Sequence, residues 1–343
     1  MFSRKNIYST IEHYFYGSLL YGMGLFFYLN NSYYDSLLKD ATKEILIFLY
    51  FSYLAVAPFA FFLNSKKDIN DHKPTLIFKT IKKIVFGAIK YACGFMFVEK
   101  QKFPKMLPKE KTAILFVFVK LFYVPLMLNF LIGNYHGFFA NYRDLVPLNS
   151  IETLSLAGYT FALSFIFFVD VLFFSFGYLF EAGFLKNKVR SVEPTLLGWA
   201  VALVCYPPFN THFTKYVGWV ANDYVMFSTI NITFIARMSV IFLLMIYLWA
   251  TILLGTKCSN LTNRGIVTTG AYKYIRHPAY ISKNLAWWIT IIPIMSVPVF
   301  ITMFIWSFVY YLRAITEERH LSQDPDYRDY CKKTRYMFVP YVV

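Results

Sequence analysis

The feature that most constrains this chain is a succession of apolar runs, each about as long as a bilayer is thick. A helix needs about 20 mostly apolar residues to cross the hydrocarbon core, where backbone polar groups must be satisfied internally. The 343 residues are 57% hydrophobic and only 15% charged, whereas about a quarter of a soluble domain is charged. The sequence therefore predicts an all-α, polytopic integral membrane protein.

About eight of these runs are candidate transmembrane helices. They cover residues 14–29, 45–63, 112–132, 153–180, 195–209, 225–254, 280–295 and 297–312. The fifth run ends at Pro207-Pro208, so we expect it to be broken or tilted. The last two runs are together too long for one crossing and are separated by Ser296-Val297-Pro298, which predicts a C-terminal helical hairpin.

Lysine and arginine gather in alternate loops, which predicts the sidedness of the chain. The pattern is consistent if residues 84–98, flanked by lysines on both sides, form an interfacial or re-entrant segment rather than a span. Both termini and the loop 265–280 are then cytoplasmic, in a bacterial inner membrane or an endoplasmic reticulum. With this distribution, the net charge of +15 indicates contact with anionic lipid headgroups and not with nucleic acid.

The basic stretch Lys186–Glu193, followed by Pro194, is the predicted boundary between two regions. Residues 1–190 would form an N-terminal membrane region of unassigned role, and residues 191–343 a C-terminal functional region. The four cysteines are far apart and show no paired spacing. They predict reduced thiols and no metal site.

Three polar stretches follow the sixth run: "GIVTTGAYKYIRHPAY" (265–280), "RAITEERHL" (313–321) and the tail "DYRDYCKKTRYMFVPYVV" (326–343). If the hairpin returns to its starting side, all three meet at one cytoplasmic site. Arg313 and Glu317 are four residues apart and share a helix face, with Glu318 beside them. Each group alone has a plain interpretation as a loop cap, a solvated helix end or a headgroup anchor, whereas their combination favours a binding pocket.

The stretch "VTTGAYKYIRHPAY", followed about 40 residues later by Glu317-Glu318 and by a tyrosine-rich basic tail, resembles the isoprenylcysteine carboxyl methyltransferase family. The related phospholipid methyltransferases share the Glu-Glu element. The resemblance extends from near Val225 to the end of the chain. It implies an integral-membrane enzyme that transfers a methyl group from S-adenosylmethionine to a lipidic acceptor: a prenylcysteine carboxylate, a phospholipid headgroup or another membrane-embedded molecule.

The resemblance also implies roles for individual residues. Cofactor-binding residues would be Val267, Thr268, Thr269 and Gly270 on the adenosine side, Tyr272, His277 and Tyr280 around the cofactor, and Glu317 at its ribose or ammonium group. Arg276, Arg313 and Glu318 would be catalytic, orienting the substrate or bracing the carboxylates. Many members have glycine two residues after the second motif tyrosine, where this chain has Ser282, followed by Lys283 and Asn284. We therefore expect an altered substrate path.

These residue types suit the chemistry of the cofactor. S-adenosylmethionine carries a sulfonium, an ammonium and a carboxylate, which require aromatic faces, an acidic group and a cationic or hydrogen-bonding group. Methyl transfer is an in-line displacement, so alignment and exclusion of water are the main tasks. An anionic acceptor needs no base, whereas an amine must lose a proton to Glu317, Glu318 or His277.

Two alternatives and one further hypothesis follow from the sequence. The ending "YCKKTRYMFVPY" is also similar to sterol reductases, which would use NADPH, and a non-enzymatic lipid-binding or transport protein is the second alternative. Asp170 and Arg237 lie near mid-depth of the fourth and sixth runs, where charged residues usually have partners. We hypothesise that they form an ion pair. The oligomeric state is not indicated.

Overall fold

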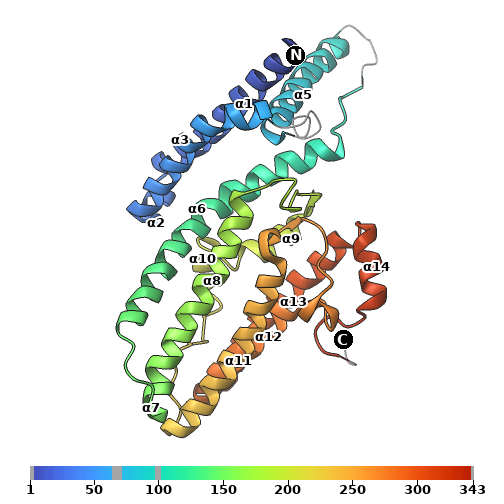
Figure 1. Ribbon diagram of the computed structural model, residues 1–343. Helices are drawn as coiled ribbons and strands as arrows, with labels where there is room; N and C mark the ends of the chain where they lie inside the picture. The colour runs from blue at the N-terminus through green and yellow to red at the C-terminus, as the bar shows by residue number, and fades with distance from the viewer. Residues whose placement is uncertain (1–3, 64–71, 97–101, 341–343) are drawn as a thin grey trace. The chain divides into compact units, whose positions relative to one another are not determined.

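The computed structural model describes residues 4–63, 72–96 and 102–340 of the chain (Figure 1). The described residues are 74% helical, which confirms the all-α prediction. The described strands are β1 (Ser191–Val192) and β2 (Thr262–Asn263), which pair antiparallel. The chain forms two compact units, residues 1–129 and 130–343.

The first unit contains α1 (Arg4–Asn30), α2 (Ser32–Leu37), α3 (Asp40–Leu63), α5 (Lys73–Met96) and the first part of α6 (Pro108–Arg143). Helix α1 packs along both α3 and α5. Asn129 of α6 accepts hydrogen bonds from the Lys39 backbone over 2.8 Å and the Thr42 hydroxyl over 2.9 Å, which fixes α6 against the start of α3. Helix α5 contains most of the predicted interfacial segment 84–98, of which residues 97 and 98 lie outside the described residues.

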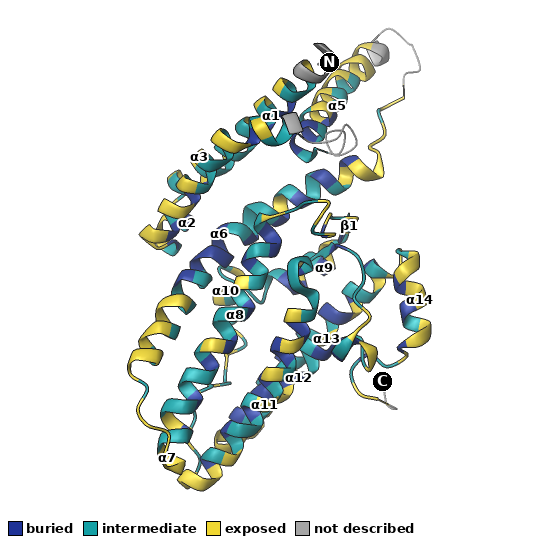
Figure 2. Ribbon diagram, in the orientation of Figure 1, coloured by how far each residue is buried: buried dark blue, intermediate teal, exposed yellow. Residues whose placement is uncertain are grey.

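The second unit is built around α11, which packs against α8 and α12 (Figure 1). Its buried core comprises Tyr159, Leu163 and Ile166 of α8 with Val240, Leu244, Tyr247 and Leu248 of α11. Figure 2 shows this buried surface along the facing sides of the helices. After α6, its elements are α7 (Ile151–Thr153), η1 (Leu154–Gly158), α8 (Tyr159–Leu179), β1, α9 (Leu196–Leu203), α10 (Phe209–Phe213), α11 (Ile230–Leu254), η2 (Gly255–Lys257), β2, η3 (Gly270–Lys273), α12 (Pro278–Thr290), η4 (Ile292–Ile294), α13 (Val297–Leu321) and α14 (Pro325–Lys333).

Five stretches of the described chain are long and apolar enough to cross a membrane. They are Asp40–Phe61, Pro108–Arg143, Ile151–Leu179, Ile230–Lys257 and Val297–Leu321, and they indicate an integral membrane protein. The other three predicted runs correspond to α1, α9 and α12, which fall short in length or hydropathy. Helix α9 ends at Leu203, shortly before Pro207 and Pro208, which cannot donate backbone hydrogen bonds. The count of eight spans and the sidedness stay predictions.

Helices α12 and α13 form the hairpin that the sequence predicts. The indole of Trp288 donates to the Ser307 hydroxyl over 3.0 Å. The rings of Trp287 and Tyr310 lie 5.1 Å apart, centroid to centroid. Since the chain turns back at η4, the beginning of α12 lies beside the end of α13.

The hypothesised ion pair between Asp170 and Arg237 is wrong, because each group has other partners. The Asp170 carboxylate accepts a hydrogen bond at each oxygen, from the Tyr247 hydroxyl over 2.7 Å and the Thr251 hydroxyl over 2.8 Å. Two hydroxyl groups of α11 thus satisfy the carboxylate oxygens without a contact from Arg237.

Arg237 instead fixes the loop that precedes α11. Its guanidinium donates to the backbone oxygens of Ser155 over 2.6 Å and Tyr224 over 3.0 Å. It also lies 4.7 Å from the centroid of the Tyr159 ring. Backbone carbonyls outside regular helices need such donors when they are buried.

Candidate functional site

The loop before α12 is fixed by the C-terminal tail. The backbone N–H groups of Arg276 and His277 donate to the carbonyls of Tyr336 over 3.0 Å and Met337 over 2.9 Å. The Arg276 side chain donates to two further tail carbonyls, those of Thr334 over 3.0 Å and Arg335 over 2.5 Å. These bonds hold the "RHP" segment at the open end of the hairpin, where α12 begins at Pro278.

Glu318 of α13 binds both basic residues of this loop. Its Oε1 atom lies 2.6 Å from Nε of Arg276 and 3.1 Å from Nε2 of His277. The three side chains are largely buried: the exposed fraction is 18% for Glu318, 12% for Arg276 and 5% for His277. Burial alone would lower the pKa of Arg276, but the hydrogen bond to Glu318 raises it above its ordinary value. The pair therefore remains charged and joins α13 to the loop.

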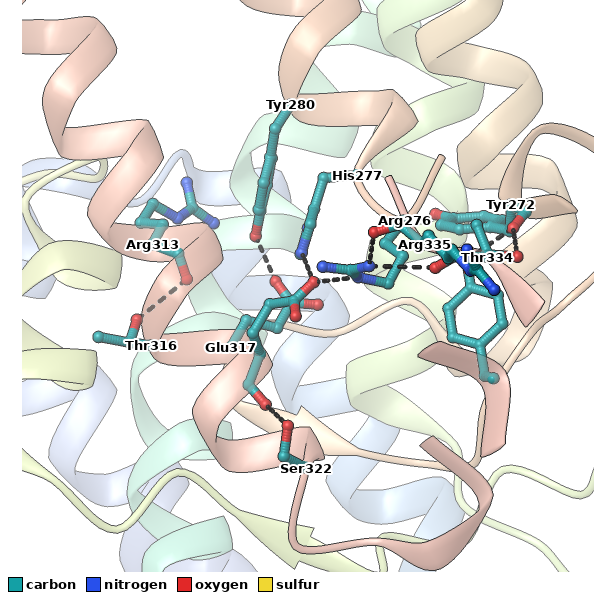
Figure 3. Close-up of polar contacts among 12 residues, drawn as sticks. Tyr272, Arg276, His277, Tyr280, Arg313, Thr316, Glu317, Ser322, Thr334 and Arg335 are labelled. Atoms are coloured by element: carbon teal, nitrogen blue, oxygen red, sulfur yellow. Dashed lines mark hydrogen bonds and ion pairs between the residues drawn. The ribbon is translucent and has the colours of Figure 1, made fainter. Parts of the chain in front are cut away.

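Tyr280 and Glu317 form a second link between α12 and α13. The Tyr280 hydroxyl donates to Oε2 of Glu317 over 2.7 Å. The His277 ring stacks on the Tyr280 ring, with centroids 5.3 Å apart and planes within 6° of parallel. Figure 3 shows the two rings side by side, with their polar ends directed toward the glutamates of α13. Loop, helix and carboxylates thus meet at one place.

Arg313 lies one turn before Glu317 but does not bind the carboxylates. Its guanidinium donates to Oδ1 of Asn260 over 3.0 Å. It lies 5.3 Å from the Tyr280 ring and 5.2 Å from the Tyr310 ring, measured to the centroids. Of the two predicted bracing arginines, Arg276 contacts a glutamate and Arg313 contacts the aromatic side of the site.

The predicted adenosine-side loop lies against another cluster. Val267 packs with the buried residues Ala250, Tyr272, Tyr327 and Tyr330. The backbone carbonyl of Tyr272 accepts a 2.6 Å hydrogen bond from the Tyr330 hydroxyl, which ties the loop backbone to α14. Thr268 and Thr269 are exposed.

Gly270 lets this loop pass close to α11. Its φ of +60° lies in the left-handed region, and an added Cβ would lie 2.4 Å from a methyl carbon of Leu253. The glycine thus lets the loop backbone lie against α11 at Leu253.

Sequence reasoning missed a clamp formed by residues 190–193. Arg190 binds Asp324 over 2.8 Å and Asp326 over 2.6 Å at the start of α14. Ser191 hydrogen-bonds His320 over 2.9 Å. This stretch was interpreted only as a boundary, because no spacing rule connects it with residues more than 120 positions away.

Asn260 and Tyr310 were also missed. Tyr310 precedes Arg313 by three residues on α13, so helical periodicity could have placed it on the same face. Asn260 lies in an irregular loop between η2 and β2, and no local signal identifies it.

Comparison with known protein families gives a match over part of the second unit. Residues 229–324 match the phospholipid methyltransferase family, which is related to the isoprenylcysteine carboxyl methyltransferases. The match runs from α11 to the residue before α14 and contains Arg276, His277, Tyr280, Glu317 and Glu318. It confirms the resemblance and supports a membrane methyltransferase. No curated protein and no solved structure matches the chain.

Proposed function

We propose that this chain, which carries a phospholipid methyltransferase segment at residues 229–324, transfers a methyl group from S-adenosylmethionine to a lipidic acceptor. The observation that carries the proposal is the meeting of the Arg276–Tyr280 loop with Glu317 and Glu318 inside this segment. We further propose that residues 191–343 form the catalytic region, and that the N-terminal region 1–190 has a separate role.

The residues present fit the cofactor. Oε2 of Glu317 accepts the Tyr280 hydroxyl, whereas Oε1 has no hydrogen-bond donor among the described residues. It is therefore available to a ribose hydroxyl or an ammonium. The stacked rings of His277 and Tyr280 offer aromatic faces of the kind that attract a sulfonium. Tyr272 and the backbone of residues 267–270 would hold the adenosine side.

When bound, S-adenosylmethionine supplies an electrophilic methyl group. The protein's contribution is to align the reactants and to exclude water. Arg276 and Glu318 position His277 through their shared contacts, and Tyr280 orients Glu317. If the acceptor is an amine, Glu317 or His277 takes its proton, because Oε1 of Glu318 already accepts from two basic groups. Arg313 faces the acceptor side between two tyrosine rings.

We further propose that this site lies at the cytoplasmic face, which the distribution of basic loop residues predicts. A water-soluble cofactor would reach it from the cytoplasm, and the lipidic acceptor would reach it from within the bilayer. This arrangement accounts for the position of the polar groups at one end of an apolar hairpin.

Calorimetric titration of the purified full-length protein with S-adenosylhomocysteine and with NADPH tests the proposal. We expect micromolar binding of S-adenosylhomocysteine, which is lost in His277→Ala and Glu317→Ala and retained in the exposed control Glu152→Ala. Binding of NADPH alone would favour the reductase. Binding of neither would favour a non-enzymatic lipid-binding or transport protein.

A further inference from the structure

Lys283 lies on the face of α12 that leads from the proposed site into the apolar part of the hairpin. Tyr280, Lys283, Asn284 and Trp287 are spaced by three or four residues, so they share one face of this helix. Lys283 is three residues beyond Tyr280, which corresponds to about 4.5 Å along the axis. Lys283 therefore lies nearly one helical turn farther along α12 than Tyr280, the residue that contacts Glu317.

The Lys283 ammonium is surrounded by aromatic rings. Its Nζ atom lies 4.8 Å from the ring centroid of Tyr247, 5.5 Å from that of Trp287 and 5.8 Å from that of Phe167. Among the described residues, no hydrogen bond or ion pair reaches this nitrogen. A cation in an apolar setting is costly unless an anion accompanies it.

The nearby carboxylates do not contact the Lys283 ammonium directly, so neither forms an ion pair with it in the described part of the chain. Asp170 and Asp223 interact with Lys283 only electrostatically, and both oxygens of Asp170 are already occupied by hydroxyl groups. Arg313 adds a second positive charge close to Lys283. The region thus offers a cation with free hydrogen-bonding capacity.

A further observation points to a ligand beside Lys283. Oδ1 of the buried Asn284 has no hydrogen-bond partner among the described residues, which is unusual for a buried polar atom.

We propose that Lys283 binds the anionic group of the lipidic acceptor, a phosphodiester or a carboxylate, and that Asn284 accepts a hydrogen bond from a neighbouring hydroxyl or amine of the same molecule. This inference rests on the proposed methyltransferase function. In an aminophospholipid the amine is two carbons from the phosphodiester. An anion held at Lys283 therefore places that amine within about one helical turn, near Tyr280 and Glu317.

The test measures lipid binding to the purified full-length protein, with three probes of equal chain length. They are a short-chain phosphatidylethanolamine, which is zwitterionic and carries an anionic phosphodiester, a fatty acid, which carries a carboxylate, and an uncharged diacylglycerol. The first two are called the anionic probes here because each contains an anionic group. We expect Lys283→Met to weaken binding of an anionic probe about 10-fold or more, and Lys283→Arg and the exposed control Lys215→Met to leave it nearly unchanged. Diacylglycerol binding should not change. The anionic probe that loses affinity identifies phosphodiester or carboxylate as the ligand.

The inference is overturned if Lys283→Met weakens diacylglycerol binding equally, or if neither anionic probe loses affinity. It is also overturned if Asp170→Asn restores lipid binding to Lys283→Met, since Lys283 would then only balance Asp170. Should Lys283→Met fail to fold, Lys283→Gln gives the same comparison. S-adenosylhomocysteine binding is measured in parallel: its absence in the unmodified protein refutes the methyltransferase, while the lipid titration still decides the role of Lys283.

Discussion

The phenol of Tyr280 donates a hydrogen bond to Oε2 of Glu317 across 2.7 Å, although the two residues are 37 positions apart. The bond exists because the hairpin brings the first turn of α12 beside the last turns of α13. The other oxygen of Glu317, Oε1, has no hydrogen-bond donor among the described residues. The bond therefore sets the direction in which that carboxylate acts.

Replacing Tyr280 with phenylalanine removes this bond and keeps the ring that stacks on His277. A hydrogen bond to a charged group contributes about 1.5–3 kcal/mol, so we expect S-adenosylhomocysteine affinity to fall about 10-fold or more. Calorimetry measures this loss. Tyr311→Phe, an exposed tyrosine on α13, is the matched control, and equal affinities in all three proteins would contradict a role for the bond.

Glu318→Gln should loosen the contact of the loop with α13. The change removes the charge that binds Arg276 at 2.6 Å and His277 at 3.1 Å, and leaves a largely buried guanidinium without its anion. Breaking such a pair costs about 2 kcal/mol or more. Thermal unfolding in detergent should show a lowered Tm for Glu318→Gln. The control Glu152→Gln, at an exposed helix start, should show no change in Tm.

Arg276→Lys tests the same contact from the other side. Lysine retains the charge but cannot reach Glu318 and the carbonyls of Thr334 and Arg335 with one planar group. We expect faster hydrogen exchange in the tail beyond Lys333, and weaker S-adenosylhomocysteine binding. Unchanged exchange in the tail would show that the backbone bonds to Tyr336 and Met337 suffice.

The clamp at Asp324 should depend on pH. Burial alone would raise the pKa of Asp324, but hydrogen bonds from Arg190 and Asn263 lower it below its ordinary value of 3.8. The ionised carboxylate therefore stabilises the docked α14 above about pH 4, and this contribution is lost as the pH falls through the lower, folded-state pKa. Hydrogen-exchange protection of α14 should decrease over that range.

Asp324→Asn should remove most of this pH dependence, and the exposed control Asp144→Asn should leave it intact. The same pH profile in Asp324→Asn and the unmodified protein would assign the effect to another group.

The sequence predicted those features that depend on local pattern. The hairpin followed from two apolar runs around Pro298, and the spacing of Arg313, Glu317 and Glu318 followed from helical geometry. Partners supplied by distant loops were not predictable: Arg313 binds Asn260, and its orientation depends on how η2 and β2 turn. No periodicity encodes that path.

The intramembrane charges show the same limit. Asp170 and Arg237 were paired in the hypothesis because they are opposite in sign and similar in depth. Depth along a helix does not fix which face a side chain occupies, and hydroxyl and carbonyl groups were not considered as partners. Tyr247 and Thr251, four residues apart on α11, are the partners that helical spacing could have proposed for Asp170.

The separate environments of Asp170 and Arg237 predict independent effects. Asp170→Asn and Arg237→Gln should each destabilise the protein, and their effects on the free energy of unfolding should add within about 0.5 kcal/mol in the double variant. An ion pair would instead give a double variant no worse than either single one. Chemical denaturation of the four proteins in the same detergent makes the comparison.

Gly177 lets α8 approach the loop that supports Arg313. A Cβ at this position would lie 1.9 Å from the backbone oxygen of Cys258 and 3.0 Å from its carbonyl carbon, so the backbone would have to move. We expect Gly177→Ala to cost about 3 kcal/mol or more and to displace Asn260, two residues beyond Cys258.

Gly137→Ala is the matched control, since nothing lies within 4 Å of a Cβ on that helical glycine. Alanine is favoured over glycine in a helix by about 1 kcal/mol, so this variant should be unchanged or slightly more stable. Thermal unfolding and S-adenosylhomocysteine titration are measured on both variants. If Gly177→Ala unfolds at the same temperature as Gly137→Ala, the close contact between α8 and Cys258 does not exist, and another element must hold Asn260 against Arg313.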